Sequence, residues 1–176
     1  MTDKFNKCIP VILRNEGGFV NDSDDSGGAT KYGISLHFLK GTGNLIDFDF
    51  DHDGDIDIDD IRLLTVEVGS LAYYRYFWLP MLLDQLKNDD LALQVFDMTV
   101  NAGMRQATRI LQQVSGCKTD SIIGPKTIAA ANTWSEVIVN RYRESRIQFY
   151  RDLVNKKPAL KKFLKGWINR CNNTKF

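Results

Sequence analysis

The stretch from Glu16 to Thr30 reads EGGFVNDSDDSGGAT, a single glutamate followed by a glycine-broken loop rich in carboxylates. Upstream of it, Phe5, Ile9 and Leu13 stand at helical spacing, which predicts an N-terminal helix that ends near Glu16 and is stopped by two glycines. A carboxylate at the negative end of a helix, beside an aromatic residue, has two reasons to hold its proton. A protonated carboxyl is what a general acid must be.

The loop that follows offers partners for such an acid. Asp22, Asp24 and Asp25 are candidates for a second carboxylate, and Thr30 offers a hydroxyl that could position a water. Hydrolysis of a glycosidic bond uses this set of groups. The alternative is that Glu16 is a solvated helix-end residue and the aspartates only form turns, since short motifs carry false positives.

A second acidic stretch, residues 49–60, reads DFDHDGDIDIDD and fits the twelve-residue loop of an EF-hand. Carboxylates occupy positions 1, 3, 5, 9 and 12, glycine occupies position 6, and position 7 would ligate through its backbone carbonyl. The predicted calcium ligands are Asp49, Asp51, Asp53, Asp55 and Asp60.

Two features qualify this calcium loop. Position 12 holds aspartate instead of the usual bidentate glutamate, which should weaken binding or change denticity. Only one such loop is present, which favours bracing of the surrounding lobe over calcium signalling. The alternative is a solvated acidic loop without metal, although so many like charges would repel one another.

Helical patterns dominate the rest of the chain. We expect an exiting helix over 61–78, a long central helix over 91–114, and further helices over 135–154 and 160–170. Strand signals are confined to a possible short hairpin within 19–34. The chain is therefore predicted to be mainly α, with one lobe over 1–88 and a helical lobe over 89–176 in one compact unit.

Three polar or aromatic residues are candidates for binding a saccharide. Asp97 and Asn101 are four residues apart, hence on one helical face, and could donate to or accept from sugar groups. Tyr32 could stack on a sugar ring. The alternative is that Asp97 and Asn101 form a buried polar pair and that Tyr32 simply packs.

Composition limits the remaining possibilities. The 176 residues carry a net charge of +1, three cysteines without a C-x-x-C motif, and two isolated histidines. This pattern fits reduced thiols and argues against a zinc site or a Ser-His-Asp triad. We see neither a signal peptide nor an apolar run long enough to span a bilayer.

Charge is unevenly distributed, because residues 20–60 are dominated by aspartate whereas residues 141–175 are basic. The basic helices could contact an anionic cell envelope, or they could be ordinary solvated surfaces. No nucleic acid is expected as a partner, and we expect a monomer.

Residues 16–35, EGGFVNDSDDSGGATKYGIS, resemble the signature of glycoside hydrolase family 108, the N-acetylmuramidases of phages and bacteria. The segments YYRYFW at 73–78 and DMTVNAG at 97–103 resemble that family's helices. Two further segments, LQQ through GPKT within 111–127 and FLKGWINR at 163–170, resemble its peptidoglycan-binding-like C-terminal part. The resemblance covers most of the chain and implies a lysozyme-like helical domain with a short β-hairpin, here with an EF-hand-like loop.

The resemblance also implies roles. Glu16 matches the family's catalytic glutamate, Asp25 matches the aspartate ahead of its glycine pair, and Thr30 matches its threonine. The expected reaction is cleavage of the β-1,4 bond between N-acetylmuramic acid and N-acetylglucosamine, by either an inverting or a retaining route. An endolysin of this kind would be made in the host cytoplasm without a signal peptide and would reach the periplasm through holin-type release. The competing predictions are a lytic transglycosylase and a non-catalytic, calcium-dependent peptidoglycan-binding module.

Overall fold

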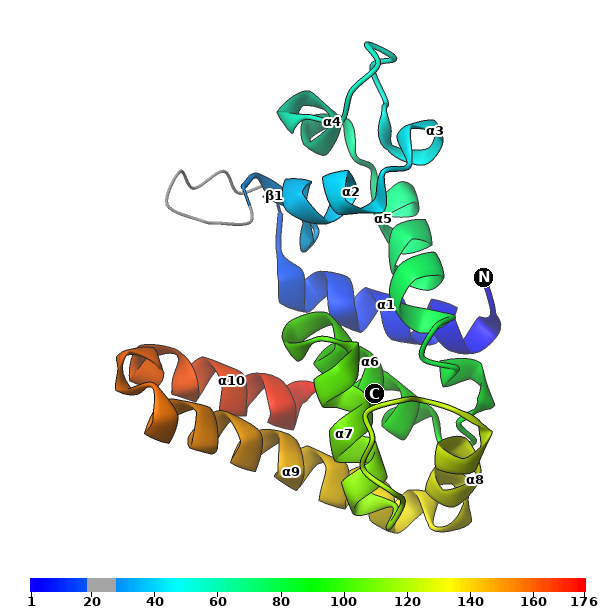
Figure 1. Cartoon of the computed structure of the whole chain (residues 1–176), viewed down its shortest axis with the longest axis vertical. Coiled ribbons are helices and arrows are strands. Elements are labelled where there is room, and N and C mark those ends of the chain that lie inside the picture. The colour runs from blue at the N-terminus through cyan, green and yellow to red at the C-terminus, as the bar shows by residue number, and fades with distance from the viewer. Residues whose placement is uncertain (19–27) are drawn as a thin grey trace. The chain divides into compact units, whose positions relative to one another are not determined.

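The chain folds mainly into helices with one small antiparallel sheet, which confirms the predicted fold class (Figure 1). The computed structural model describes residues 1–18 and 28–176. The α-helices are α1 (Asp3–Glu16), α2 (Leu36–Thr42), α3 (Leu45–Phe48), α4 (Ile58–Leu63), α5 (Val66–Tyr73), α6 (Asp89–Ala102), α7 (Met104–Val114), α8 (Pro125–Thr133), α9 (Ser135–Lys156) and α10 (Lys161–Asn173). The remaining elements are the π-helix η1 (Tyr74–Trp78), the 3₁₀-helices η2 (Leu83–Gln85) and η3 (Pro158–Leu160), and the strands β1 (Thr30–Lys31) and β2 (Ile34–Ser35).

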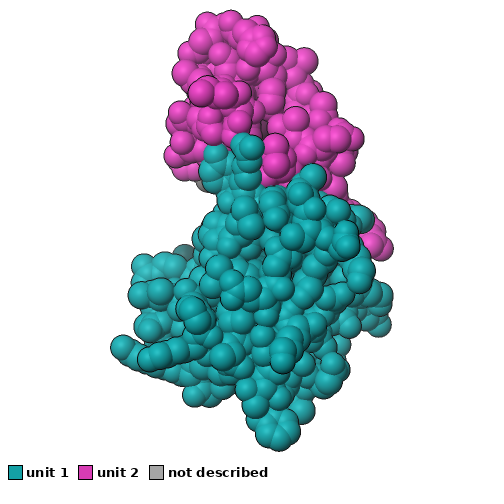
Figure 2. Space-filling view, turned by 90° about the vertical axis from the view of Figure 1, so that its right-hand side faces the viewer, with its two compact units in different colours: residues 1–11, 74–176 teal, residues 12–73 magenta. Residues whose placement is uncertain are grey.

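These elements divide into two compact units (Figure 2). Unit 1 comprises residues 1–11 and 74–176, and unit 2 comprises residues 12–73. The division falls within α1 and again between α5 and η1. Unit 2 therefore contains the segment after Glu16 and the acidic loop, whereas unit 1 contains α6 to α10.

Unit 2 contains the short hairpin, in which β1 pairs with β2 and Thr30 is opposite Ser35. Its two-residue loop is Tyr32-Gly33, and both residues have positive φ, at 54° and 76°. Positive φ at both central positions is what a type I′ turn requires. The Ser35 hydroxyl then accepts from the Phe38 N–H and caps α2, so turn and cap together fix how the chain leaves the hairpin.

Unit 1 has an apolar core into which most of α6 is buried. Phe5, Trp78 and Phe96 form an edge-to-face cluster, with ring centroids 5.3 Å apart for Phe5 and Trp78 and 5.1 Å apart for Trp78 and Phe96. α7 and α9 lie side by side (Figure 1). Edge-to-face packing adds stabilisation beyond the buried area alone.

The structure corrects two predicted helices. The helix expected over 91–114 is two helices, because Gly103 adopts φ +85° and separates α6 from α7. The helix expected over 61–78 begins earlier, at Ile58, and is broken after Leu63, where the Thr65 hydroxyl accepts from the Val68 N–H at the start of α5. The N-terminal helix is confirmed, and Gly17 follows it at φ +77°.

The three cysteines are free thiols, as predicted. Cys8 and Cys171 are buried, and burial raises the pKa of the Cys8 thiol to about 12. A thiol that stays protonated is a poor nucleophile. In the described part of the chain, no helix combines the length and apolar character needed to cross a membrane.

Candidate active site and acidic loop

Glu16, the predicted acid, is the last residue of α1 and is half-buried. Its side chain lies against Gly33 in the hairpin turn. A β-carbon added to Gly33 would stand 2.7 Å from both Cγ and Oε2 of Glu16, and 2.5 Å from the Tyr73 hydroxyl oxygen. The Glu16 carboxylate and the Tyr73 hydroxyl therefore approach the same face of a residue that must be glycine.

Tyr73 comes from α5 and is completely buried. Its hydroxyl donates to the backbone carbonyl of Tyr32 at 2.9 Å. A tyrosine hydroxyl has one hydrogen, and here that hydrogen is directed to the hairpin. Toward another neighbouring group, the Tyr73 hydroxyl can therefore act as a hydrogen-bond acceptor.

The structure locates the other predicted site residues of unit 2 as follows. Thr30 is half-buried on β1, three residues before Gly33 in the same hairpin. Tyr32 is half-buried in the turn, and the Lys31 ammonium lies 5.7 Å from its ring centroid. Asp25 and its competitors Asp22 and Asp24 lie outside the described residues.

Gly33 and Tyr73 were not among the predicted site residues. The Tyr-Gly pair between Thr30 and Ser35 is a turn signal, but it does not tell which side chains approach the glycine. Tyr73 lies in a segment whose resemblance to a family helix was noted, yet nothing in its spacing points to Glu16. Both contacts depend on packing between segments well separated in the chain.

Asp97 and Asn101, the predicted saccharide contacts, belong to unit 1. Asp97 is completely buried, where Arg146 donates to Oδ2 and Arg170 lies 2.8 Å from Oδ1. Asn101 is exposed, and its side-chain oxygen accepts from the Tyr150 hydroxyl at 2.6 Å. The burial and pairing of Asp97 favour the structural interpretation of this residue over a role in sugar binding.

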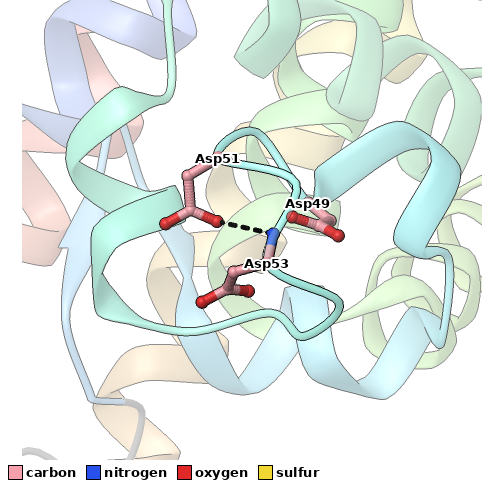
Figure 3. A group of neighbouring side chains, drawn as sticks. All are labelled: Asp49, Asp51 and Asp53. Carbon is pink, nitrogen blue, oxygen red and sulfur yellow. Dashed lines mark hydrogen bonds between the residues drawn. The ribbon is translucent and has the colours of Figure 1, made fainter.

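The acidic loop at 49–60 wraps its carboxylates around its own backbone. Asp51, beside Asp49 and Asp53, accepts from the Asp53 N–H at 3.4 Å (Figure 3). Asp49 accepts from the Gly54 N–H at 3.1 Å, and Gly54 adopts φ +99° at the sharp turn. One carboxylate oxygen from each of Asp49, Asp51 and Asp53 lies within 4.8 Å of the other two.

The other end of the loop places Asp60 at the start of α4. Asp60 is 1% exposed, and its two oxygens accept from the N–H groups of Phe50, at 2.6 Å, and Asp57, at 2.7 Å. Asp55, Asp57 and Asp60 form a second group of carboxylates within 4.8 Å of one another. A carboxylate has about four lone-pair directions, so Asp60 keeps capacity for a cation.

Two observations test whether this loop suits a hard cation. The Asp49 Oδ1 atom is buried and has no hydrogen-bond partner among the described residues. Burial and the Asp53 charge raise the pKa of Asp51, and the Asp53 charge and burial raise the pKa of Asp55. An orphaned buried oxygen and mutually repelling carboxylates are what an oxygen-ligated cation would relieve, so the residues fit calcium.

A mainly helical unit that ends a helix on a half-buried glutamate, against a tight hairpin, belongs to the class of lysozyme-like folds. The family model described as Glycosyl hydrolase 108 matches residues 9–103. A second model, described as Predicted Peptidoglycan domain, matches residues 106–172. The chain belongs to glycoside hydrolase family 108, and it is a glycosidase that acts on peptidoglycan.

The chain is also similar to solved structures. One is titled as the structure of Brucella abortus SagA, with 26% sequence identity and a TM-score of 0.78. The similarity covers 97% of this chain and 90% of the other. A search of curated proteins found no match.

Proposed function

We propose that the protein is an N-acetylmuramidase that cleaves the β-1,4 bond between N-acetylmuramic acid and N-acetylglucosamine, with Glu16 as the general acid. The observation that carries the proposal is the contact of the Glu16 side chain with Gly33, at the point where the Tyr73 hydroxyl also arrives. A glycosidase needs one carboxyl that is held in place and can deliver a proton to the leaving oxygen.

The direction of the Tyr73 hydrogen bond supports an acid role. Because its hydrogen is given to the Tyr32 carbonyl, the Tyr73 oxygen can act toward Glu16 only as an acceptor. An acceptor at this point can accept the hydrogen of a carboxyl and hold it in a fixed direction.

The second half of the reaction requires an activated water or a nucleophile. We propose that Asp25, with the Thr30 hydroxyl, fills this role, as family resemblance implies. A separation of about 5 to 5.5 Å between the two carboxyl groups would indicate a retaining enzyme, and about 6.5 to 9.5 Å an inverting one. The product's anomeric configuration, read by NMR at early times, distinguishes the two routes.

The decisive experiment compares the wild type with Glu16→Gln on outer-membrane-permeabilised Gram-negative cells. We measure loss of turbidity and identify the products by mass spectrometry. Glu16→Gln keeps the shape of the side chain but cannot supply the proton, so we expect the rate to fall about 10²- to 10⁴-fold. The matched control is Glu67→Gln, which removes an exposed glutamate of unit 2 and should leave the rate unchanged.

The products separate the alternatives. Fragments with a reducing N-acetylmuramic acid end support the muramidase, and reducing N-acetylglucosamine ends would contradict the proposed bond. Anhydro-muramic products would identify a lytic transglycosylase, which also uses a single acid/base glutamate. Turbidity loss that persists in Glu16→Gln would remove Glu16 from the mechanism, and no turbidity loss with either protein would leave a non-catalytic peptidoglycan-binding module as the better description.

We further propose that residues 49–60 bind Ca²⁺ through the carboxylates of Asp49, Asp51, Asp53 and Asp60 and the carbonyl of Asp55. The support is the orphaned Asp49 Oδ1 and the clustering of carboxylates at both ends of the loop. The bound ion would brace unit 2, which also holds the Glu16 site. Its role is structural, since it would neutralise charge and would not touch substrate.

Calorimetric titration of the EDTA-treated protein with Ca²⁺ tests the metal proposal directly. Asp49→Asn should abolish or strongly weaken binding, because it removes the charge at position 1 of the loop. Asp59→Asn is the matched control, since Asp59 is exposed, pairs with Arg62, and stands at a non-ligating position. Absence of heat and of any shift in unfolding temperature with the wild type would contradict the proposal.

Family resemblance extends the proposal to a role in lysis of a host cell, with the enzyme released from the cytoplasm by a holin-type pore. Co-expression with and without a holin tests this step. Lysis that requires both proteins supports it, and lysis by the enzyme alone contradicts it.

A further inference from the structure

Unit 1 carries a groove that none of the roles above uses. It runs between α7 and α9, two helices that pack side by side (Figure 1). Two adjoining hollows form it, of about 340 Å³ and 450 Å³, and Gln113 lines both. We call this feature the α7–α9 groove; the residues used below are Gln106, Arg109, Gln113, Ser115, Trp134 and Arg141.

The lining of the first hollow is polar in a way that suits sugars. Gln106, Gln113 and Gln148 present amide groups, and Ser145 presents a hydroxyl. Amides both donate and accept hydrogen bonds, so they can pair with the hydroxyl and N-acetyl groups of an amino-sugar polymer.

The second hollow is bounded by Trp134 at the start of α9. Trp134 is 70% exposed, although tryptophan is highly buried on average. The Ser115 hydroxyl at the same hollow is buried and has no hydrogen-bond partner among the described residues. The exposed Trp134 side chain can stack on the apolar face of a sugar ring, whereas the buried Ser115 hydroxyl is not accessible from the hollow.

The charged residues of the α7–α9 groove favour peptidoglycan over nucleic acid as its ligand. Arg109, Arg141 and Lys156 line it, against the single acid Asp152. Within the described part of the chain, none of the three cations forms a salt bridge, whereas Asp152 accepts from Gln148. Peptidoglycan carries carboxylates on its stem peptides at intervals between neutral sugars. Separate cations among amides suit separate carboxylates better than the continuous phosphates of a nucleic acid.

We propose that the α7–α9 groove binds an uncleaved peptidoglycan strand, with a sugar ring stacked on Trp134 and stem-peptide carboxylates paired with Arg141 and Arg109. The inference deepens the peptidoglycan activity proposed above by assigning the surface of unit 1 that holds the polymer. The groove lies within residues 106–156, inside the segment that matches the peptidoglycan domain model.

The test is co-sedimentation with insoluble peptidoglycan, carried out in a Glu16→Gln background so that cleavage does not remove the ligand. Trp134→Ala and Arg141→Gln should each weaken binding about tenfold, as expected for an aromatic anchor and for a paired charge at a binding surface. The effect of Arg141→Gln should shrink at high salt, whereas that of Trp134→Ala should persist.

Two matched controls accompany these variants. Ile122→Ala removes a side chain that is 72% exposed in the same unit but outside the groove, and Arg151→Gln removes an exposed arginine of α9 that does not line it. Both should bind like the parent, and thermal unfolding should show all four variants folded.

Unchanged sedimentation of Trp134→Ala and Arg141→Gln would overturn the inference. The inference would also be overturned if the protein bound duplex DNA more tightly than peptidoglycan and both variants lost that DNA binding. The groove would then be a nucleic-acid site. Neither result bears on whether Glu16 is the acid, because binding is measured without turnover. Conversely, a failed Glu16 test would leave the sedimentation result valid.

Discussion

At the scale of single residues, Gly33 is the position on which the candidate active site depends. It needs positive φ for the turn and lacks the side chain that would strike Glu16 and Tyr73. Gly33→Ala should therefore lower activity strongly and cost about 1 to 2 kcal/mol in the free energy of unfolding from backbone strain alone. Gly43→Ala is the matched control, because Gly43 also has positive φ, at 62°, but open space around it. Equal activity of the two variants per folded molecule, measured by turbidity and urea unfolding, would contradict the role given to Gly33.

The Tyr73 hydroxyl supports a second prediction at this scale. Tyr73→Phe leaves the Tyr32 carbonyl without its donor, so stability should fall by about 1 kcal/mol. Activity should fall as well, because the acceptor beside Glu16 is lost. Tyr142→Phe provides the comparison: Tyr142 is also buried and donates to a backbone carbonyl, that of Ala107, but in unit 1. Similar unfolding free energies for the two variants, with activity lost only in Tyr73→Phe, would separate positioning of the acid from simple packing.

At the scale of elements, Asp97 joins three helices, because it stands on α6 and pairs with Arg146 of α9 and Arg170 of α10. Asp97→Ala leaves both arginines without their partner, one of them fully buried, and should cost about 3 to 5 kcal/mol. Arg170→Met should cost less, since Asp97 then keeps Arg146. Urea unfolding measures both. If Asp97 instead bound sugar, its loss would raise KM and leave the unfolding free energy nearly unchanged.

The elements also mark how far the sequence could predict this structure. Hydrophobic spacing predicted the N-terminal helix and its end at Glu16 correctly, because the apolar positions of one helix recur within a short stretch of sequence. It missed the break at Gly103, since one glycine is tolerated within many helices and only its φ of +85° reveals the interruption. The Asp97 partners lie 49 and 73 residues away, and no local pattern encodes such pairing. The clustering of the carboxylates in the acidic loop was predictable because they all lie within twelve consecutive residues, and calcium binding there stays a prediction.

At the scale of the whole molecule, calcium should stabilise the protein through unit 2. A ligand that binds only the folded state at 100 times its dissociation constant adds about 2.7 kcal/mol to the free energy of unfolding. Hydrogen exchange should show the added protection within residues 12–73, where the loop lies. Asp49→Asn should remove the calcium-dependent part and leave exchange in unit 1 unchanged. Protection that appears only in unit 1 would contradict the site.

Acidity should act on the calcium-free and calcium-bound molecules in opposite directions. The pKa values of Asp51 and Asp55 are raised in the folded state, so the folded protein takes up protons before the unfolded chain does as pH falls. In the calcium-free protein, these two groups should therefore destabilise the fold most near neutrality, where both are charged. Their unfavourable contribution to the free energy of unfolding should shrink as pH falls through their raised pKa values. Calcium competes with those protons. Its stabilising effect should thus shrink between about pH 7 and pH 4, near the ordinary pKa of aspartate.

Thermal unfolding across this range checks the prediction, with Asp53→Asn as the comparison, because removing the Asp53 charge should flatten the calcium-free profile. A calcium effect that stays constant across the range would mean that the ion binds elsewhere than at these carboxylates.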